Sequence, residues 1–425
     1  MSQALHIWVG SIKAATLELI DNSFSLTYTQ AWQQSPRAFA FSPHLPLSQM
    51  SQGAGVRYFF SNLLPEGKPL EALSHAYQVS QYDVFGILRN VGRDCAGALV
   101  LTDEDTAPAA QAIFNSDVYE KLGHAQLQDR ITESRAQDIS LMFWRGKRRM
   151  SLPGVQNKMG VYMAQNGSLW LPKDGAPTSH ILKVGDDRHP DMVINEFVCM
   201  RLAKLLGFAV PNVQWLALPE PVLMVQRYDR QWTADGGLLR THQIDGCQAL
   251  NIAPEQKYEE PAYQSAPSGA SFAQLLKLHT LCQVPAKAQI TLLQWLMLNF
   301  MLGNTDAHAK NLSFVVSPQG MTVAPFYDLV CGSAYGYPDM AQCIGGETNL
   351  SVISTTQWQQ LAEECVIPMN LLKQLCKPLL ARFGKVMAKL PMDVQLALET
   401  AQSEAVRQML PKIAARVNRL AESLL

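Results

Sequence analysis

The sequence predicts an α+β fold in which a strand-rich early region is followed by a mostly helical region. Short segments of alternating or β-branched residues end near residue 228. Long apolar segments with helical spacing begin near residue 271. A chain of 425 residues can also bury a large core and divide into two or three domains. We expect a small N-terminal α/β region, a second strand-rich region and a helical C-terminal region.

Residues 1–105 are expected to form the first domain. Residues 5–30 alternate and contain β-formers, which indicates a hairpin or small antiparallel sheet. Two short helices and a buried strand follow, at residues 58–64, 70–77 and 95–102. The run 102–110 is acidic and rich in small residues, so we place a linker there.

Residues 106–270 are expected to form the second domain. Asn166-Gly167 between two strand-like runs is a strong hairpin signal. The predicted strands are 159–163, 168–172, 181–184, 213–218 and 222–228, with a helix at 192–206 that ends at Gly207. This order of strands, helix and strands is that of the small lobe of a protein kinase. Residues 259–270 are rich in Pro and Ser and are predicted to be a mobile loop.

Residues 271–425 are expected to form the helical domain. The predicted helices are 275–280, 288–303, 371–390 and 394–424, the last broken at Pro411. A short hairpin is predicted around Gln319-Gly320.

The composition is that of an ordinary globular protein, with 48% hydrophobic residues, 17% charged residues and a net charge of -1. A strongly basic chain would suggest generic nucleic-acid binding, and this balance gives no such indication. The eight cysteines form no C-x-x-C pair, and the longest apolar segment, 292–302, is too short to span a bilayer. The N-terminus lacks the pattern of a signal peptide. We therefore expect a cytoplasmic protein with no membrane partner.

The most informative segment runs from Gly303 to Asn311. Asp306 and Asn311 stand five residues apart, and a second acid, Asp328, follows Phe326-Tyr327 downstream. Protein kinases use this order and spacing in H-R-D-x-x-x-x-N followed by D-F-G. We predict Asp306 as the catalytic base and Asn311 and Asp328 as ligands of Mg²⁺, which prefers oxygen ligands.

Two other side chains of this loop have alternative roles. His308 either supports the loop by hydrogen bonding or takes part in the reaction. Lys310 either neutralises the transferring phosphoryl group or is a solvated lysine.

Further residues are predicted to bind ATP. Lys183 lies on an apolar strand before a helix, where a kinase places its phosphate-binding lysine, and Glu196 is its predicted partner. The segment 151–158 has a single glycine, which can still shape a backbone nest for phosphate oxygens. Its predicted ATP-binding members are Pro153, Gly154, Val155, Gln156, Asn157 and Lys158. Gln226 and Tyr228, at a strand end, are predicted to lie at an adenine-binding hinge.

Together these motifs resemble those of the HipA family of serine/threonine kinase toxins. The T-D-x-H-x-K-N run at 305–311 and the P-F-Y-D run at 325–328 are its most specific elements. Other matching segments are 59–65, 91–98, 151–158, 180–183, 195–196, 225–230, 242–243 and 247–248.

The resemblance implies a kinase-like fold of two lobes and an enzyme that uses ATP and Mg²⁺ to phosphorylate a serine or threonine of a protein. The expected target is an aminoacyl-tRNA synthetase such as glutamyl-tRNA synthetase, whose inactivation would inhibit translation and promote growth arrest and persistence. The resemblance also implies autophosphorylation of a loop serine, which matches Ser151.

The resemblance implies a HipB-type helix-turn-helix antitoxin as partner, in a complex that binds operator DNA. Between Thr348 and Gln357 the chain lacks the lysine-rich DNA-contacting stretch of known relatives. We therefore expect contact with DNA to run through the antitoxin. Two alternatives remain open: a kinase-like enzyme acting on a small molecule, and a catalytically silent co-repressor subunit.

Overall fold

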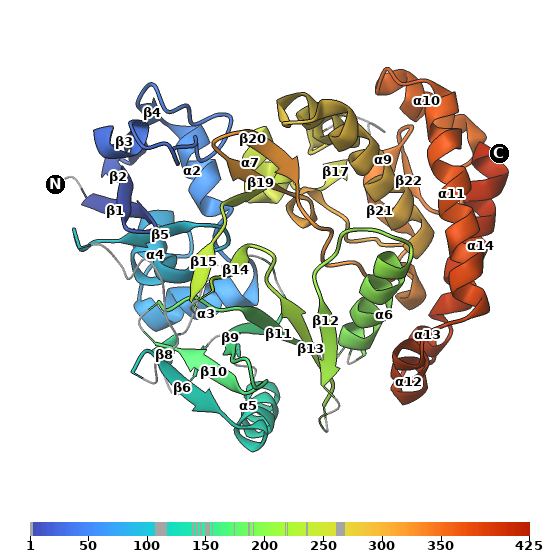
Figure 1. Ribbon diagram of the computed structural model, residues 1–425, viewed down its shortest axis with the longest axis horizontal. Coiled ribbons are helices and arrows are strands. Elements are labelled where there is room, and N and C mark those ends of the chain that lie inside the picture. Colours follow the sequence, from blue (N-terminus) through green and yellow to red (C-terminus); the bar gives the residue numbers. More distant parts are fainter. Residues whose placement is uncertain are drawn as a thin grey trace. The chain divides into compact units, whose positions relative to one another are not determined.

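The protein is described from a computed structural model (Figure 1). The structure describes residues 3–106, 117–137, 140–141, 143–144, 147–148, 154, 156–173, 175–185, 188–189, 191–216, 218, 220–234, 237–260 and 268–425. The chain forms two compact units. The first comprises Met1–His189, Leu216–Ile244 and Val315–Gly320, and the second Pro190–Trp215, Asp245–Phe314 and Met321–Leu425.

An N-terminal sheet begins the first unit, with the strand order β4-β3-β2-β1-β5. Its strands are β1 (Gln3–Val9), β2 (Ile12–Ile20), β3 (Ser23–Tyr28), β4 (Ser51–Gln52) and β5 (Leu99–Thr102). The first three form an antiparallel meander, which confirms the small sheet predicted at 5–30. Asp21 and Asn22, with φ of 48° and 62°, form the turn between β2 and β3, because a two-residue hairpin loop needs positive φ.

Short helices accompany this sheet, namely α1 (Gln30–Gln33), α2 (Ala54–Ser61), α3 (Lys68–Tyr77), α4 (Val84–Val91) and the 3-10 helix η1 (Gly92–Asp94). The strand predicted at 95–102 begins only at Leu99. The carbonyl groups of Cys95 and Gly97 instead accept hydrogen bonds from the guanidinium of Arg230, so this backbone is not available for strand pairing.

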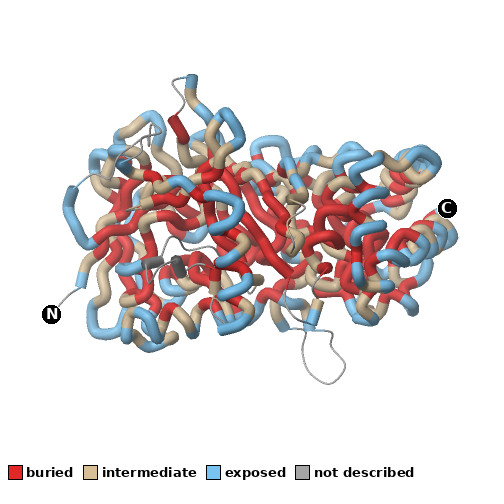
Figure 2. The backbone as a smooth tube through the Cα atoms, turned by 90° about the horizontal axis from the view of Figure 1, so that it is seen from below, coloured by how far each residue is buried: buried red, intermediate tan, exposed pale blue. Residues whose placement is uncertain are grey.

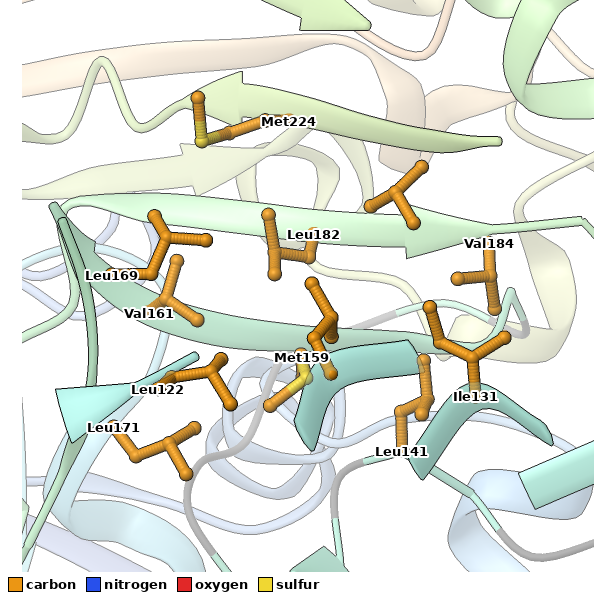
Figure 3. Close-up of a cluster of buried hydrophobic side chains, with 12 residues drawn as sticks. Leu122, Ile131, Leu141, Met159, Val161, Leu169, Leu171, Leu182, Val184 and Met224 are labelled. Atoms are coloured by element: carbon orange, nitrogen blue, oxygen red, sulfur yellow. The ribbon is translucent and has the colours of Figure 1, made fainter. Parts of the chain in front are cut away.

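Five of the six strands of a second sheet lie wholly in the first unit, in the order β13-β11-β9-β10-β6. These are β6 (Tyr119–Leu122), β9 (Lys158–Met163), β10 (Leu169–Pro172), β11 (His180–Val184) and β13 (Val222–Gln226). The predicted hairpin is present, with Leu169 opposite Met163. Figure 3 shows Leu, Val and Met side chains of this sheet packing together with Ile131 of α5 (His124–Ala136). Two strand pairs complete the unit: β7 (Phe143–Trp144) with β8 (Lys147–Arg148), and β14 (Arg230–Trp232) with β15 (Leu238–Arg240).

The second unit is mostly helical. Its helices are α6 (Met192–Leu205), α7 (Gly246–Leu250), α8 (Phe272–Lys277), α9 (Pro285–Leu302), α10 (Thr355–Glu364), α11 (Met369–Ala388), α12 (Met392–Thr400), α13 (Glu404–Arg407) and α14 (Met409–Leu424). Its 3-10 helices are η2 (Pro254–Gln256), η3 (Leu278–Leu281), η4 (Ala309–Asn311) and η5 (Gly332–Tyr335). Helix α9 is buried on nearly every side from Leu292 to Leu302, as its apolar sequence requires.

Short strands join these helices. Two antiparallel pairs are β17 (Glu259–Glu260) with β18 (Ser268–Gly269), and β21 (Asp339–Ile344) with β22 (Glu347–Asn349). Residues of β12 (Val213–Leu216), β16 (Gln243–Asp245), β19 (Ser313–Ser317) and β20 (Gly320–Val323) are divided between the two units. The loop predicted at 259–270 is therefore wrong at its two ends, which pair as β17 and β18.

The helix predicted at 394–424 is broken, but the prediction of a break at Pro411 is wrong. The chain leaves the helical conformation after Thr400 and again between α13 and α14. Pro411 lies in the first turn of α14, where a missing backbone N–H costs little.

Buried residues form the interior of the described chain, and exposed residues concentrate in turns and on outer helix faces (Figure 2). Across the described residues, none of the helices has both the length and the apolar character that crossing a bilayer demands.

Candidate active site

The predicted site residues divide between the two units, and each group is described within its own unit. Asp306, His308, Lys310, Asn311 and Asp328 belong to the second unit. The described residues of the nucleotide-binding prediction, apart from these, belong to the first. Ser151, Pro153 and Val155 lie outside the described residues.

The loop that carries Asp306 begins where α9 ends. Gly303 has φ of 65° and ends the helix in the left-handed conformation. The Asn304 side chain then ties the loop to the helix: its Nδ2 donates to Asn299 Oδ1 at 2.8 Å, and its Oδ1 accepts from the backbone N–H of Asp306 at 3.1 Å. The position of Asp306 is thus set by a buried amide network anchored on α9.

The carboxylate of Asp306 is partly exposed to solvent and lies next to two other side chains of the site. Its side chain is 50% exposed, so a substrate can reach it. Oδ1 accepts a hydrogen bond of 2.7 Å from the Tyr258 hydroxyl, and His308 Nε2 lies 3.7 Å from the same oxygen. The rings of Tyr258 and His308 meet edge to face at 5.1 Å. The sequence interpretation missed Tyr258, which lies 48 residues before Asp306 and belongs to no motif.

Asn311 closes the loop onto Asp306. Its side-chain Nδ2 donates to the backbone carbonyl of Asp306 at 2.7 Å, and its backbone N–H donates to His308 at 2.8 Å. Because the amide nitrogen of Asn311 is engaged in this way, the amide orientation directs Oδ1 away from the Asp306 carbonyl. Oδ1 is an oxygen of the kind that binds Mg²⁺.

The segment carrying Asp328 is tied to the same loop. Asp328 has φ of 51°, a conformation that non-glycine residues rarely adopt. Its carbonyl accepts from Asn304 Nδ2 at 3.5 Å, and the hydroxyl of the preceding Tyr327 donates to the carbonyl of Lys310 at 2.7 Å. The structure therefore brings together the two segments that carry the predicted magnesium ligands.

Lys310 is buried rather than solvated, with only 6% of its surface exposed. Its Nζ lies 3.7 Å from Asp245 Oδ2, and Asp245 in turn caps the N-terminus of α7 by accepting from the backbone of Gln248. The solvated-lysine alternative is therefore wrong.

Two lysines of the first unit lie side by side on adjacent strands. Lys183 of β11 is directly opposite Lys158 of β9, and both are buried. Two neighbouring buried cations favour anions close by, and phosphate oxygens are such anions. Glu196, the predicted partner of Lys183, is buried in α6 of the second unit, and their pairing stays a prediction.

Gly154 lies close to Lys158 and has a backbone conformation that favours glycine. It has φ of 103°, and a Cβ built on it would lie 2.9 Å from Lys158 Nζ. The Asn157 side chain supports the same segment by accepting from Leu141 N–H at 2.8 Å and donating to Ser134 Oγ at 3.0 Å. Gln156 Nε2 is buried, and the described residues offer it no hydrogen-bond acceptor. A buried donor beside buried lysines is consistent with a phosphate-binding segment.

The predicted hinge lies at the end of β13. Gln226 is opposite His180 in the strand ladder, and the Tyr228 hydroxyl bonds to the Gln243 side chain. Next to it lies a fully buried ionic network that the sequence interpretation did not identify, made of Asp94, Arg227, Asp229 and Arg230. This network fixes the backbone around the hinge.

Comparisons with known proteins match the chain along most of its length. The family described as HipA-like C-terminal domain matches residues 150–387, and the HipA N-terminal domain family matches residues 5–102. The serine/threonine-protein kinase toxin HipA of Shewanella oneidensis is 32% identical over 378 residues, which is 87% of this chain and 84% of that protein. The putative kinase Y4mE of Sinorhizobium fredii is 33% identical over 392 residues, 91% of each chain.

A solved structure is also similar. It contains HipA and HipB of the Shewanella oneidensis MR-1 toxin–antitoxin system with their operator DNA, and its matching chain has a TM-score of 0.83 and 29% identity. The match covers 99% of this chain and 97% of that one. These similarities confirm the predicted α+β, kinase-like fold.

Proposed function

The chain belongs to the HipA family, and from this premise we propose that it is an ATP-dependent serine/threonine protein kinase that acts as the toxin of a toxin–antitoxin pair. The observation that carries the proposal is the loop geometry of the second unit. There a half-exposed Asp306 carboxylate, the Asn311 amide and the Asp328 segment are tied into one hydrogen-bonded arrangement.

In the proposed mechanism, Asp306 would accept the proton of the acceptor hydroxyl as that oxygen forms a bond to the transferred phosphorus and the bond from this phosphorus to the leaving ADP oxygen breaks. Tyr258 and His308 orient the Asp306 carboxylate. Asn311 Oδ1 and the Asp328 carboxylate would hold Mg²⁺, and this oxygen donor set suits that ion. Bound Mg²⁺ and ATP supply the transferable phosphoryl group and the charge that stabilises it. Lys310, buried beside Asp245, would contribute positive charge next to the phosphates.

The first unit would bind the nucleotide. Lys183 and Lys158 would pair with phosphate oxygens of the nucleotide. Gly154 would let the backbone approach the same phosphate oxygens. The same segment, 151–158, would also contact the nucleotide through Pro153, Val155, Gln156 and Asn157. Gln226 and Tyr228 would meet the adenine at the strand end, and Glu196 would orient Lys183.

The family resemblance supports a proposal for the substrate and the partners. We propose that the target is a serine of an aminoacyl-tRNA synthetase such as glutamyl-tRNA synthetase, so that phosphorylation inhibits translation and promotes growth arrest and persistence. Ser151 would be autophosphorylated, which adds about -1.5 to -2 charge beside a phosphate-binding segment and would switch the enzyme off. A HipB-type antitoxin would neutralise the kinase and contact operator DNA. The domain division at 1–105, 106–270 and 271–425 remains part of this proposal.

Transfer of radiolabelled phosphate from ATP by the purified protein tests the activity. Asp306→Ala and Asp328→Ala should each abolish transfer and the arrest of growth in cells, whereas Asp105→Ala, at an exposed ion pair, should leave both intact. If both site variants still transfer phosphate, the assignment fails. The phosphoproteome after induced expression, compared with that of Asp306→Ala, would identify the target.

A further inference from the structure

A buried junction in the second unit lies behind the predicted magnesium ligands. Asn195 of α6 is completely buried, and its side chain pairs with both backbone groups of Cys331, three residues after Asp328. Asn195 Oδ1 accepts from Cys331 N–H at 2.7 Å, and Asn195 Nδ2 donates to the Cys331 carbonyl at 3.1 Å. Two bonds to one residue fix both the position and the direction of the backbone that follows Asp328.

The Asn195 amide is itself held in place from within α6. The Cys199 thiol, one turn further along the helix, donates to Asn195 Oδ1 at 3.5 Å. Burial raises the pKa of this thiol well above its ordinary value, so the thiol keeps its proton and remains a donor. The amide orientation is therefore set by three contacts.

Arg416 of α14 reaches the same junction from the C-terminal helix. Its Nη2 donates to the carbonyl of Leu302 at 2.8 Å, and its Nε donates to the carbonyl of Met301 at 3.2 Å. These carbonyls are at the C-terminal end of α9, where backbone acceptors lack helical partners and a cation is favourable. Nη2 also lies 3.3 Å from Cys331 Sγ, so one guanidinium touches both segments.

The residue after Leu302 makes this approach possible. A Cβ on Gly303 would lie 2.4 Å from Arg416 Cζ and 2.3 Å from Ser333 Oγ, so a larger residue would displace these side chains, and the φ of 65° also favours glycine. The backbone N–H of Ser333 also donates to the carbonyl of Gly303 at 3.1 Å. The start of the Asp306 loop and the end of the Asp328 segment thus meet at one crowded point.

We propose that Asn195 and Arg416 are positioning residues that hold the Asp328 segment and the Asp306–Asn311 loop in the register needed for Asn311 and Asp328 to share a magnesium ion. Neither side chain needs to touch the nucleotide. The inference rests on the proposed kinase function, and it makes the C-terminal helix part of the support of the metal site. A purely structural role would lower stability alone, whereas a positioning role changes the dependence on magnesium.

The test measures phosphate transfer as magnesium is varied, with the melting temperature recorded without nucleotide. We expect Arg416→Gln to raise the half-saturating magnesium concentration by about tenfold, the effect of losing a charge-assisted hydrogen bond. Arg416→Lys keeps the positive charge but lacks the several N–H donors of a guanidinium group. Its half-saturating magnesium concentration should therefore lie between those of wild type and Arg416→Gln. Asn195→Asp should act like Arg416→Gln, because a carboxylate oxygen would face the Cys331 carbonyl.

Arg419→Gln is the matched control, because Arg419 lies one turn further along α14 and donates to Leu350 at 3.4 Å instead. It should leave the magnesium dependence unchanged. The proposal is overturned if Arg416→Gln and Asn195→Asp keep the wild-type magnesium dependence, or if Arg419→Gln shifts it equally. Failure of the proposed function has a different result, since wild type would then transfer no phosphate at any magnesium concentration.

Discussion

The buried ionic network beside the predicted hinge yields a quantitative prediction. Asp229 accepts five hydrogen bonds from donors of the first unit: Arg227 Nε at 2.9 Å, Arg227 Nη2 at 2.7 Å, Arg230 Nη1 at 2.8 Å, the Gly97 N–H at 2.8 Å and Gln243 Nε2 at 3.4 Å. Asp229→Asn keeps the side-chain shape but removes the charge. The new NH₂ group would face donors only.

The expected loss of folding stability in Asp229→Asn follows from the burial of this carboxylate. Burial alone would raise the pKa of Asp229, but the guanidinium groups of Arg227 and Arg230 hold it well below its ordinary value. The carboxylate is therefore charged at any pH above about 4, and its stabilising contribution is fully present there. Removing one member of a buried ion pair costs about 3 to 5 kcal/mol, because the remaining arginines would have Asp94 as their main buried counter-ion. For a unit of this size we expect the melting temperature to fall by about 10 °C.

Thermal unfolding at pH 7, followed by circular dichroism, measures this change. Asp105→Asn is the matched control, because Asp105 also has an ion pair of 2.7 Å, with Lys13, but that pair is largely exposed. The control should not change the melting temperature measurably. Equal shifts of the melting temperature for the two variants, or no shift for Asp229→Asn, would show that burial does not determine how much an ion pair contributes to stability.

Three further predictions concern the site and pH. Tyr258→Phe removes the hydroxyl that donates to Asp306 and should lower kcat for phosphate transfer about tenfold. The control Tyr82→Phe changes an exposed tyrosine and should leave kcat unchanged. Equal kcat values for the two variants would exclude a role for Tyr258. Gly154→Ala should weaken the binding of a non-hydrolysable ATP analogue about tenfold, as measured by calorimetry, because a Cβ at φ of 103° would crowd Lys158. The control Gly167→Ala has open space around its Cβ and should bind the analogue normally. Burial lowers the pKa of His180 and His242 to about 4, so below pH 6.5 the unfolded chain binds protons that the folded chain does not. Stability should therefore fall by about 3 kcal/mol per histidine between pH 6.5 and 4 in urea unfolding, and His242→Gln should reduce that slope; a flat profile would contradict the buried neutral histidines.

Local patterns predicted most of the secondary structure, because they depend on neighbours in the chain. The alternation of residues 5–30, the Asn166-Gly167 turn and the apolar run that became α9 are examples. One error arose where distant residues decide the outcome. Cys95 and Gly97 do not join a strand because Arg230, more than 130 positions away, takes their carbonyls.

The same distinction applies to the site. The spacing of Asp306, Asn311 and Asp328 predicts their roles, and the structure shows that the two segments carrying them are tied together. No sequence pattern identifies Tyr258, Asn195 or Arg416, which contact Asp306, Cys331 and Leu302 respectively. Their contacts depend on how α6, α9 and α14 pack, and a single sequence carries no local signal of such packing.

We propose above all that Asn311 and Asp328 hold a metal ion on a bound nucleotide. Crystals grown with a non-hydrolysable ATP analogue and Mn²⁺ test it directly, because the anomalous signal locates the ion. We predict a peak within about 2.2 Å of both Asn311 Oδ1 and an Asp328 carboxylate oxygen. An ion bound to the nucleotide but to neither of these residues would contradict the account.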